Sequence, residues 1–128
     1  MKIENIKFKA KRLDNGEWII GSFVVMKIPA LSKTTIGIVA ADGATLYEID
    51  PSTVCQYTGL KDCKGNEIWE GDLLAFRYSK EVGEVVWRED LACFEIADTR
   101  NKEKSNLLGY SLRNIAWYVI GNKYDKEE

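Results

Sequence analysis

Apolar and polar residues alternate along the first part of the chain, and this alternation is typical of β-strands. In residues 6–13, apolar side chains point one way and the lysines between them point the other. The dipeptide Asn15–Gly16 follows and predicts a type I′ hairpin turn into a returning strand at residues 17–28. Gly21, in the middle of that strand, indicates a bulge or a close backbone approach.

Two shorter strands are expected at residues 35–40 and 44–50, and Asp42–Gly43 is a turn sequence between them. Four strands joined by short turns form a meander. We therefore expect residues 1–50 to be an N-terminal β meander within the same structural unit as the rest of the chain.

The second half of the chain repeats short apolar runs about every ten residues, at 73–78, 83–89 and 92–98. This spacing predicts a small barrel, SH3-like and partly open, within a core spanning residues 51–128. Helix is expected only as short turns, one after Pro51, capped by Ser52 or Thr53, and one beginning at Ser111. The fold class is therefore mainly β. Residues 99–106 form a polar stretch that we expect to be the most mobile segment.

The longest apolar runs fall well short of the roughly 20 residues that cross a bilayer, and the first residues lack the apolar stretch of a signal peptide. We therefore expect a cytoplasmic protein without a membrane role. The net charge of −2 does not favour a polyanion as partner. Lys7, Lys9 and Lys11 nevertheless share one strand face and are followed by Arg12. We expect a solvated strand face, and the alternative is a nucleic-acid-binding surface.

The chain contains no histidine, which removes the Ser–His and Cys–His nucleophile systems and the commonest general base near pH 7. Cys55, Cys63 and Cys93 lack Cys-x-x-Cys spacing, so we expect free thiols and no zinc site or other cofactor.

Three carboxylates lie within six residues, at Glu67, Glu70 and Asp72. Such a cluster binds Mg²⁺ or performs acid–base chemistry only where the fold fixes its geometry. The alternative is that Glu67 and Glu70 flank an exposed turn while Asp72 bonds nearby backbone groups, and this is our expectation.

Four tryptophans and six tyrosines are many for this length. We expect at least half of them to pack in the core, with Trp69 and Trp87 as the better surface candidates because they lie beside a turn and beside charges.

The stretch DPSTVCQYTGLKDCKGNEIWEGDLL closely resembles the central signature of the YopX protein family, small proteins encoded largely by phages and prophages. A glycine–valine–tryptophan strand follows, at Gly83, Val85 and Trp87, and a closing VIGN-Y motif ends the match at Tyr124. Cys55 and Cys63 stand where the family usually has other residue types. The signature positions matched here are Thr53, Val54, Gln56, Tyr57, Thr58, Gly59, Leu60, Asp62, Gly65, Glu67, Ile68, Glu70, Gly71 and Asp72.

The resemblance implies a mostly β fold, homo-oligomerisation, a bacterial host cytoplasm and no established enzymatic activity. Our first hypothesis is a non-enzymatic, homo-oligomeric module that contacts an unknown phage or host protein. Folding explains Gln56, Tyr57, Trp69 and Glu70 least, and we expect them at the contact surface. The alternative is a nucleic-acid-binding barrel that uses Lys7, Lys9, Lys11 and Arg12 with exposed aromatics. The third is a hydrolase built on the acidic cluster.

Overall fold

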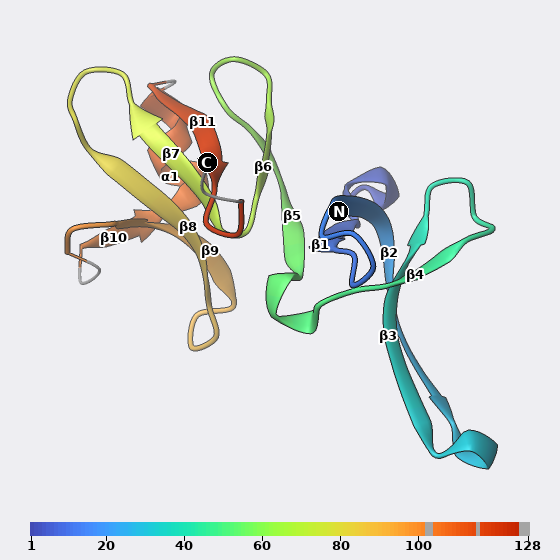
Figure 1. The fold of residues 1–128 in the computed structure, drawn as a ribbon. Helices are drawn as coiled ribbons and strands as arrows, with labels where there is room; N and C mark the ends of the chain where they lie inside the picture. The colour runs from blue at the N-terminus through green and yellow to red at the C-terminus, as the bar shows by residue number, and fades with distance from the viewer. Residues whose placement is uncertain (102–103, 115, 126–128) are drawn as a thin grey trace. The chain divides into compact units, whose positions relative to one another are not determined.

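The computed structural model describes residues 1–101, 104–114 and 116–125. The chain divides into two compact units, Met1–Tyr57 and Thr58–Glu128. The expected boundary at residue 50 stays a prediction. Both units are built from antiparallel strands with only short helical turns, so the mainly β fold class is confirmed (Figure 1).

In the first unit each strand pairs with the next along the chain, which confirms the N-terminal meander. Its strands are β1 (Phe8–Lys11), β2 (Trp18–Ile28), β3 (Lys33–Ala40) and β4 (Leu46–Glu48). Single 3-10 turns lie at Ile3–Asn5, Pro29–Leu31 and Pro51–Thr53. The last is capped by the side chain of Asp50, which accepts from the backbone N–H of Ser52, and so neither Ser52 nor Thr53 is the cap that we expected.

The hairpin between β1 and β2 forms where it was predicted, but its turn is not type I′. Such a turn needs positive φ at both central residues, and here Gly16 has positive φ while Asn15 does not. The loop is wider: the N–H of Gly16 bonds the carbonyl of Arg12, and the Asn15 side chain accepts from the N–H of Glu17. The predicted turn at Asp42–Gly43 is confirmed, and the Asp42 carboxylate accepts hydrogen bonds from the backbone N–H groups of Ala44 and Thr45.

The core of the first unit is formed by Ala10, Ile38 and Ile49, all nearly or fully buried. Gly21 lies beside β3, and a Cβ atom there would come within 2.0 Å of the carbonyl oxygen of Val39. The predicted close backbone approach is therefore confirmed, and it requires glycine.

The second unit contains the end of β5 (Cys55–Lys61), which lies beside β6 (Glu67–Trp69), and a five-stranded sheet in the order β10-β9-β8-β7-β11. The sheet strands are β7 (Asp72–Phe76), β8 (Val82–Arg88), β9 (Cys93–Asp98), β10 (Ser105–Leu107) and β11 (Trp117–Asn122). Helix α1 (Leu108–Ser111) and a 3-10 turn at Leu112–Asn114 precede β11, near the expected turn. Part of the polar stretch 99–106 forms the start of β10, and its residues 102–103 lie outside the described residues.

The core of the second unit combines β6, the sheet and α1, through Ile68, Leu74, Val85, Ile96 and Leu108. Each of the three predicted apolar runs contributes a buried residue to it. No closed barrel occurs among the described residues, which agrees with the partly open form that we expected. The likeness to an SH3 barrel stays a prediction.

Candidate functional site

The signature stretch folds into two tight turns, and the first is organised by Asp62. Its buried carboxylate accepts hydrogen bonds from the backbone N–H groups of Lys64 and Asn66, while Gly65 supplies the positive φ of the turn. The same carboxylate reaches β11, where it accepts from the N–H of Val119 at 2.9 Å. Burial alone raises the pKa of Asp62, but these backbone hydrogen bonds outweigh it, so the pKa lies below its ordinary value.

The second turn, at Gly71 and Asp72, is joined to the same C-terminal strand. The buried Asp72 carboxylate accepts from the N–H of Trp69 at 2.8 Å and from the side-chain amide of Asn122 at 2.9 Å. That amide also donates to the carbonyl of Glu70. Gly71, with φ of 82°, donates its N–H to Val85 and accepts from Lys123.

The central signature and the closing VIGN-Y motif are therefore one network, although about 50 residues separate them. Each of the two signature aspartates holds a backbone turn and also bonds a residue of β11 or its end. Hydrogen bonds to a buried carboxylate are among the stronger ones in proteins. The network gives these residues a structural role.

The acidic cluster does not assemble a metal site. No group of three or more Cys, Asp or Glu side chains is arranged to hold a metal ion in the part of the chain that the structure describes. Asp72 bonds nearby backbone, as we expected, and is buried, whereas Glu67 and Glu70 are half-buried. The hypothesis of a hydrolase built on this cluster gains no support from this arrangement.

The residues expected at a contact surface are divided between the two units. Gln56 and Tyr57 end the first unit, and Trp69 and Glu70 belong to the second. Tyr57 is only 4% exposed and Trp69 only 5%, so Trp69 is not the surface tryptophan that its position beside a turn suggested. Trp87 is 36% exposed and packs against Phe94, which places it at the surface as expected. A contact role for Gln56, Tyr57, Trp69 and Glu70 stays a prediction.

The basic face of β1 has its cations above aromatic rings. The ammonium of Lys7 lies 4.7 Å from the ring centre of Tyr57, and those of Lys9 and Lys11 lie 4.6 and 5.4 Å from Trp18. Arg12 stacks on Tyr47 and pairs with the Asp14 carboxylate. Lys7, Lys9 and Lys11 share one face of β1, as predicted, and each makes a cation–π contact. Nucleic-acid binding by this face stays a prediction.

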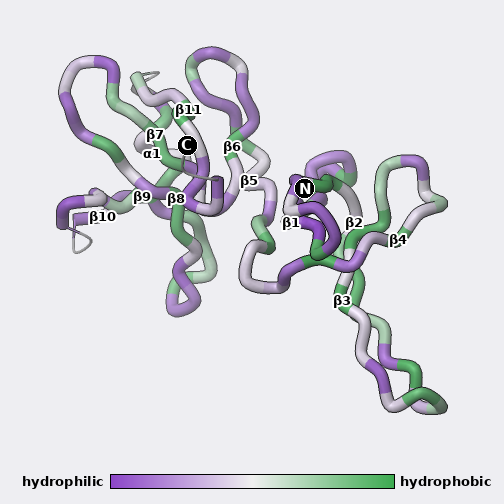
Figure 2. Tube along the Cα trace, in the orientation of Figure 1, coloured by the Kyte–Doolittle hydropathy of each residue, from purple (hydrophilic) through white to green (hydrophobic). Residues whose placement is uncertain are grey.

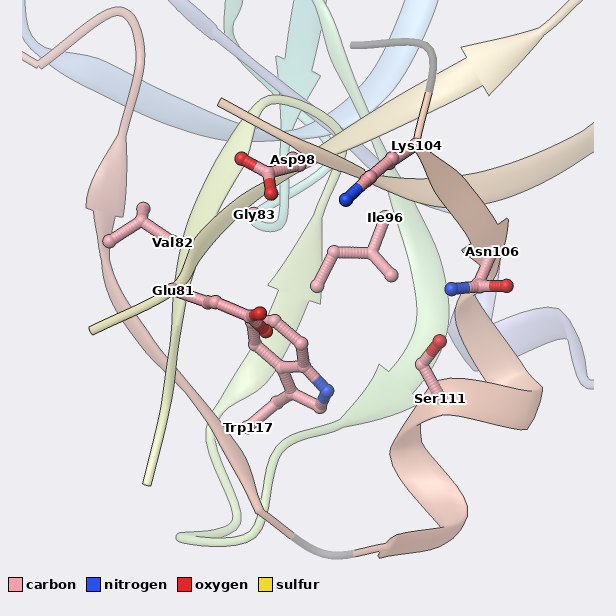
Figure 3. A pocket seen from close by; sticks show the side chains of 9 residues that line it. All are labelled: Glu81, Val82, Gly83, Ile96, Asp98, Lys104, Asn106, Ser111 and Trp117. Carbon is pink, nitrogen blue, oxygen red and sulfur yellow. The ribbon is translucent and has the colours of Figure 1, made fainter. Parts of the chain in front are cut away.

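A cavity of about 170 Å³ opens in the second unit (Figure 3). Its walls come from the start of β8, the end of β9, β10, α1 and the start of β11. Ile96, Gly83 and Trp117 give it an apolar part, and the charged side chains are Glu81, Asp98 and Lys104. Sequence reasoning named none of these residues as a site, since they are scattered over 37 positions and meet only in the folded sheet.

The hairpin of β2 and β3 extends as a two-stranded ribbon beyond the rest of the first unit (Figure 1). We call its outer part, residues 22–35, the arm. Strand β1 pairs with β2 only as far as Gly21, and β4 pairs with β3 only from Gly37. In the described residues, no other strand pairs with residues 22–28 or 33–35.

Hydrophobic residues recur along the arm, as the hydropathy colouring shows (Figure 2). Apolar side chains are exposed on both of its faces. Val25 is 50% exposed and Leu31, at the tip, is 67% exposed. Phe23 lies on the face of Val25, and Met26 lies on the opposite face, because side chains alternate along a strand. The turn at Asn15–Gly16 predicted the returning strand at residues 17–28, but the sequence gave no sign that neither face would be covered.

A model of the YopX protein family matches residues 7–128. The chain belongs to the YopX protein family. No curated protein matches it. The YopX match confirms the resemblance drawn from the signature, and it covers both units.

The two positions at which this YopX chain departs from the signature carry free thiols, as does Cys93. Cys55 is fully buried, and its Sγ contacts the carbonyl of Thr53 at 3.3 Å. Cys63 contributes its backbone N–H to the carbonyl of Trp117. The prediction of free thiols is confirmed. In the described residues, no helix is long and apolar enough to cross a membrane.

Proposed function

We propose that this YopX protein is a non-enzymatic interaction module that self-associates through the arm. The observation that carries the proposal is the arm itself, a ribbon with exposed apolar residues on both faces and strand edges left without a partner strand among the described residues. A two-stranded hairpin is marginally stable in water on its own. Exposed strand edges are also templates for pairing with another chain.

A second copy of the chain is the occupant that fits best. Two identical ribbons pair edge to edge about a two-fold axis, so that each edge meets the same edge of its partner. The only charged side chains of the arm are Lys27 and Lys33, near its tip. They leave the apolar stretch 22–26 free of like-charge repulsion between copies.

The magnitudes favour association of moderate strength. Burying one such side chain fully contributes about 1.5–3 kcal/mol, and those of the arm are already partly covered. Edge-to-edge pairing covers only part of Phe23, Val25, Met26 and Leu31, so these side chains of two copies contribute at most on the order of 8 kcal/mol, within the roughly 4–15 kcal/mol that association costs. Backbone bonds along the new strand pair supply the surplus. We expect a complex that forms at micromolar concentration and dissociates on dilution.

The setting that we propose is a phage or prophage gene product in the cytoplasm of a bacterial host, with a phage or host protein as a further partner. The phage setting rests on the family resemblance, and the non-enzymatic role rests on the missing histidine and on the structural use of Asp62 and Asp72. Light scattering tests the self-association directly. A mass that stays at the monomer value of 14.6 kDa across micromolar to millimolar concentration would refute it.

The second candidate function is nucleic-acid binding, favoured by the three lysines that share one face of β1 and by Arg12, which follows the strand. A lysine ammonium group has three N–H donors, so contact with an aromatic ring is compatible with contact to a phosphate. Phosphate contacts would make affinity fall steeply as salt is added, whereas protein association through apolar residues would not.

A further inference from the structure

The cavity of the second unit has the size of one small group. Its volume of about 170 Å³ is below the roughly 300 Å³ at which pockets for drug-sized ligands begin. A single side chain or a planar group with a short stem fits such a space. A nucleotide or a large cofactor does not.

The apolar wall of the cavity depends on a glycine. A Cβ atom on Gly83 would lie 2.4 Å from Cγ1 of Ile96, so the glycine lets the isoleucine lie against β8. The Trp117 indole forms another part of the wall, and its ring also contacts Phe76 at 5.0 Å between centres. An aromatic face held by a neighbouring ring suits a flat or cationic group.

The charged wall carries two carboxylates and one ammonium. Figure 3 shows Glu81 and Trp117 toward one end of the cavity and Asp98 and Lys104 toward the other, with Ile96 between. Asp98 is anchored, since its Oδ1 accepts from the N–H of Arg100 at 2.8 Å. Lys104 balances one carboxylate, so the three groups together carry a single negative charge. One monovalent cation neutralises it.

The aromatic and carboxylate groups of the cavity wall favour one kind of cation. A guanidinium group is planar, stacks on aromatic faces and presents N–H donors that match a carboxylate in a fork. It is also less strongly hydrated than an ammonium group. The Ser111 hydroxyl offers a further oxygen acceptor at the wall. We propose that this cavity binds a guanidinium group, stacked on Trp117 and paired with Glu81, from an arginine side chain of a partner protein or from a small arginine-like molecule.

Fluorine NMR of the full chain labelled with 5-fluorotryptophan tests the proposal, because each of the four tryptophans gives its own signal. The Trp117 signal is assigned from single Trp→Phe variants of the other three, if Trp117→Phe itself does not fold. The probes are N-acetyl-arginine-amide and, as the matched ammonium control, N-acetyl-lysine-amide. We expect a saturable shift confined to Trp117 with the arginine probe and at least about fivefold weaker binding of the lysine probe.

Two variants locate the site. Glu81→Gln removes one carboxylate from the wall and should weaken arginine binding about fivefold. Glu89→Gln removes an exposed carboxylate that does not line the cavity and should leave binding unchanged. Equal binding of the two probes, equal effects of the two variants or no shift at millimolar probe would overturn the proposal.

A further pair of probes distinguishes the two sources of the guanidinium group, a small molecule and an arginine side chain of a partner protein. If ethylguanidinium binds as tightly as N-acetyl-arginine-amide, the group alone is recognised and a small molecule suffices. If a peptide with a central arginine binds more tightly than both, the cavity receives a side chain from a partner protein. The result is independent of the arm, because Val25→Lys should leave arginine binding intact whether or not it abolishes self-association.

Discussion

The side-chain amide of Asn122 donates a hydrogen bond to the buried carboxylate of Asp72 at 2.9 Å, across 50 residues of sequence. The pair joins the turn that starts β7 to the end of β11, two strands that lie side by side at one edge of the sheet. Because the same amide also donates to the carbonyl of Glu70, one side chain satisfies two acceptors of the turn. The bond ties the central signature to the closing motif of the family.

Replacing Asn122 by alanine should therefore destabilise the second unit. Two acceptors lose their donor, and one of them is a buried carboxylate, so we expect a loss of about 2–3 kcal/mol in the free energy of unfolding. Urea denaturation measures it. Asn106→Ala, at an exposed position of β10, is the control and should change stability by less than about 0.5 kcal/mol. Equal stability of the two variants would contradict the structural role of the network.

Asp62 makes the stability of the protein depend on pH in a defined direction. Its pKa is lowered in the folded protein, since the hydrogen bonds from Val119, Asn66 and Lys64 outweigh burial. The carboxylate therefore contributes stability that is complete above its unfolded pKa, about 3.9, and is lost as pH falls through the lower folded value.

The difference in unfolding free energy between the wild type and Asp62→Asn should be constant near neutral pH and shrink below about pH 4. Urea denaturation of both proteins at a series of pH values gives this difference directly. A difference that is the same at pH 7 and at pH 2 would show that the charge of Asp62 has no part in the network.

Local signals in the sequence predicted the two turns. The hydrogen bonds that join these turns to β11 form only in the folded structure. Gly65, three residues after Asp62, and Gly71, next to Asp72, mark turns because positive φ and short acceptor side chains act within a few residues. The donors from β11 could not be predicted, since nothing within the signature specifies which distant strand would lie beside it. Trp69 looked exposed beside its turn, yet tertiary packing buries it. The cavity forms where β8, β9 and β11 come together in the fold, and no local sequence pattern predicts that arrangement.

Gly21 should tolerate no side chain. An alanine there would place its Cβ about 2.0 Å from the carbonyl oxygen of Val39, and a backbone atom cannot move away without breaking the pairing of β2 with β3. We expect a loss of at least about 3 kcal/mol in the free energy of unfolding, or failure to fold. Gly109→Ala is the matched control, because a Cβ atom there meets no atom within 4 Å. Similar thermal stability of both variants would refute the close approach.

Binding of single-stranded DNA to the basic face of β1 distinguishes the two candidate functions. If the protein acts through protein contacts, single-stranded DNA should bind negligibly at physiological salt, and Lys9→Gln should change nothing in a binding titration. If the face contacts phosphates, the logarithm of the affinity should fall linearly with the logarithm of the salt concentration, and Lys9→Gln should reduce that slope. A steep slope would establish the nucleic-acid alternative.

The most direct test of the proposed function is the molar mass in solution, measured by light scattering from micromolar to millimolar concentration. We predict a mass above the monomer value of 14.6 kDa that decreases on dilution. Val25→Lys combined with Leu31→Lys should shift the protein toward the monomer, since the charges would face each other between arms. Leu13→Lys, at an equally exposed apolar position outside the arm, should leave the mass unchanged. Self-association through the arm would be contradicted by a wild-type protein that stays at 14.6 kDa throughout. It would also be contradicted if the double variant formed the same oligomer as the wild type.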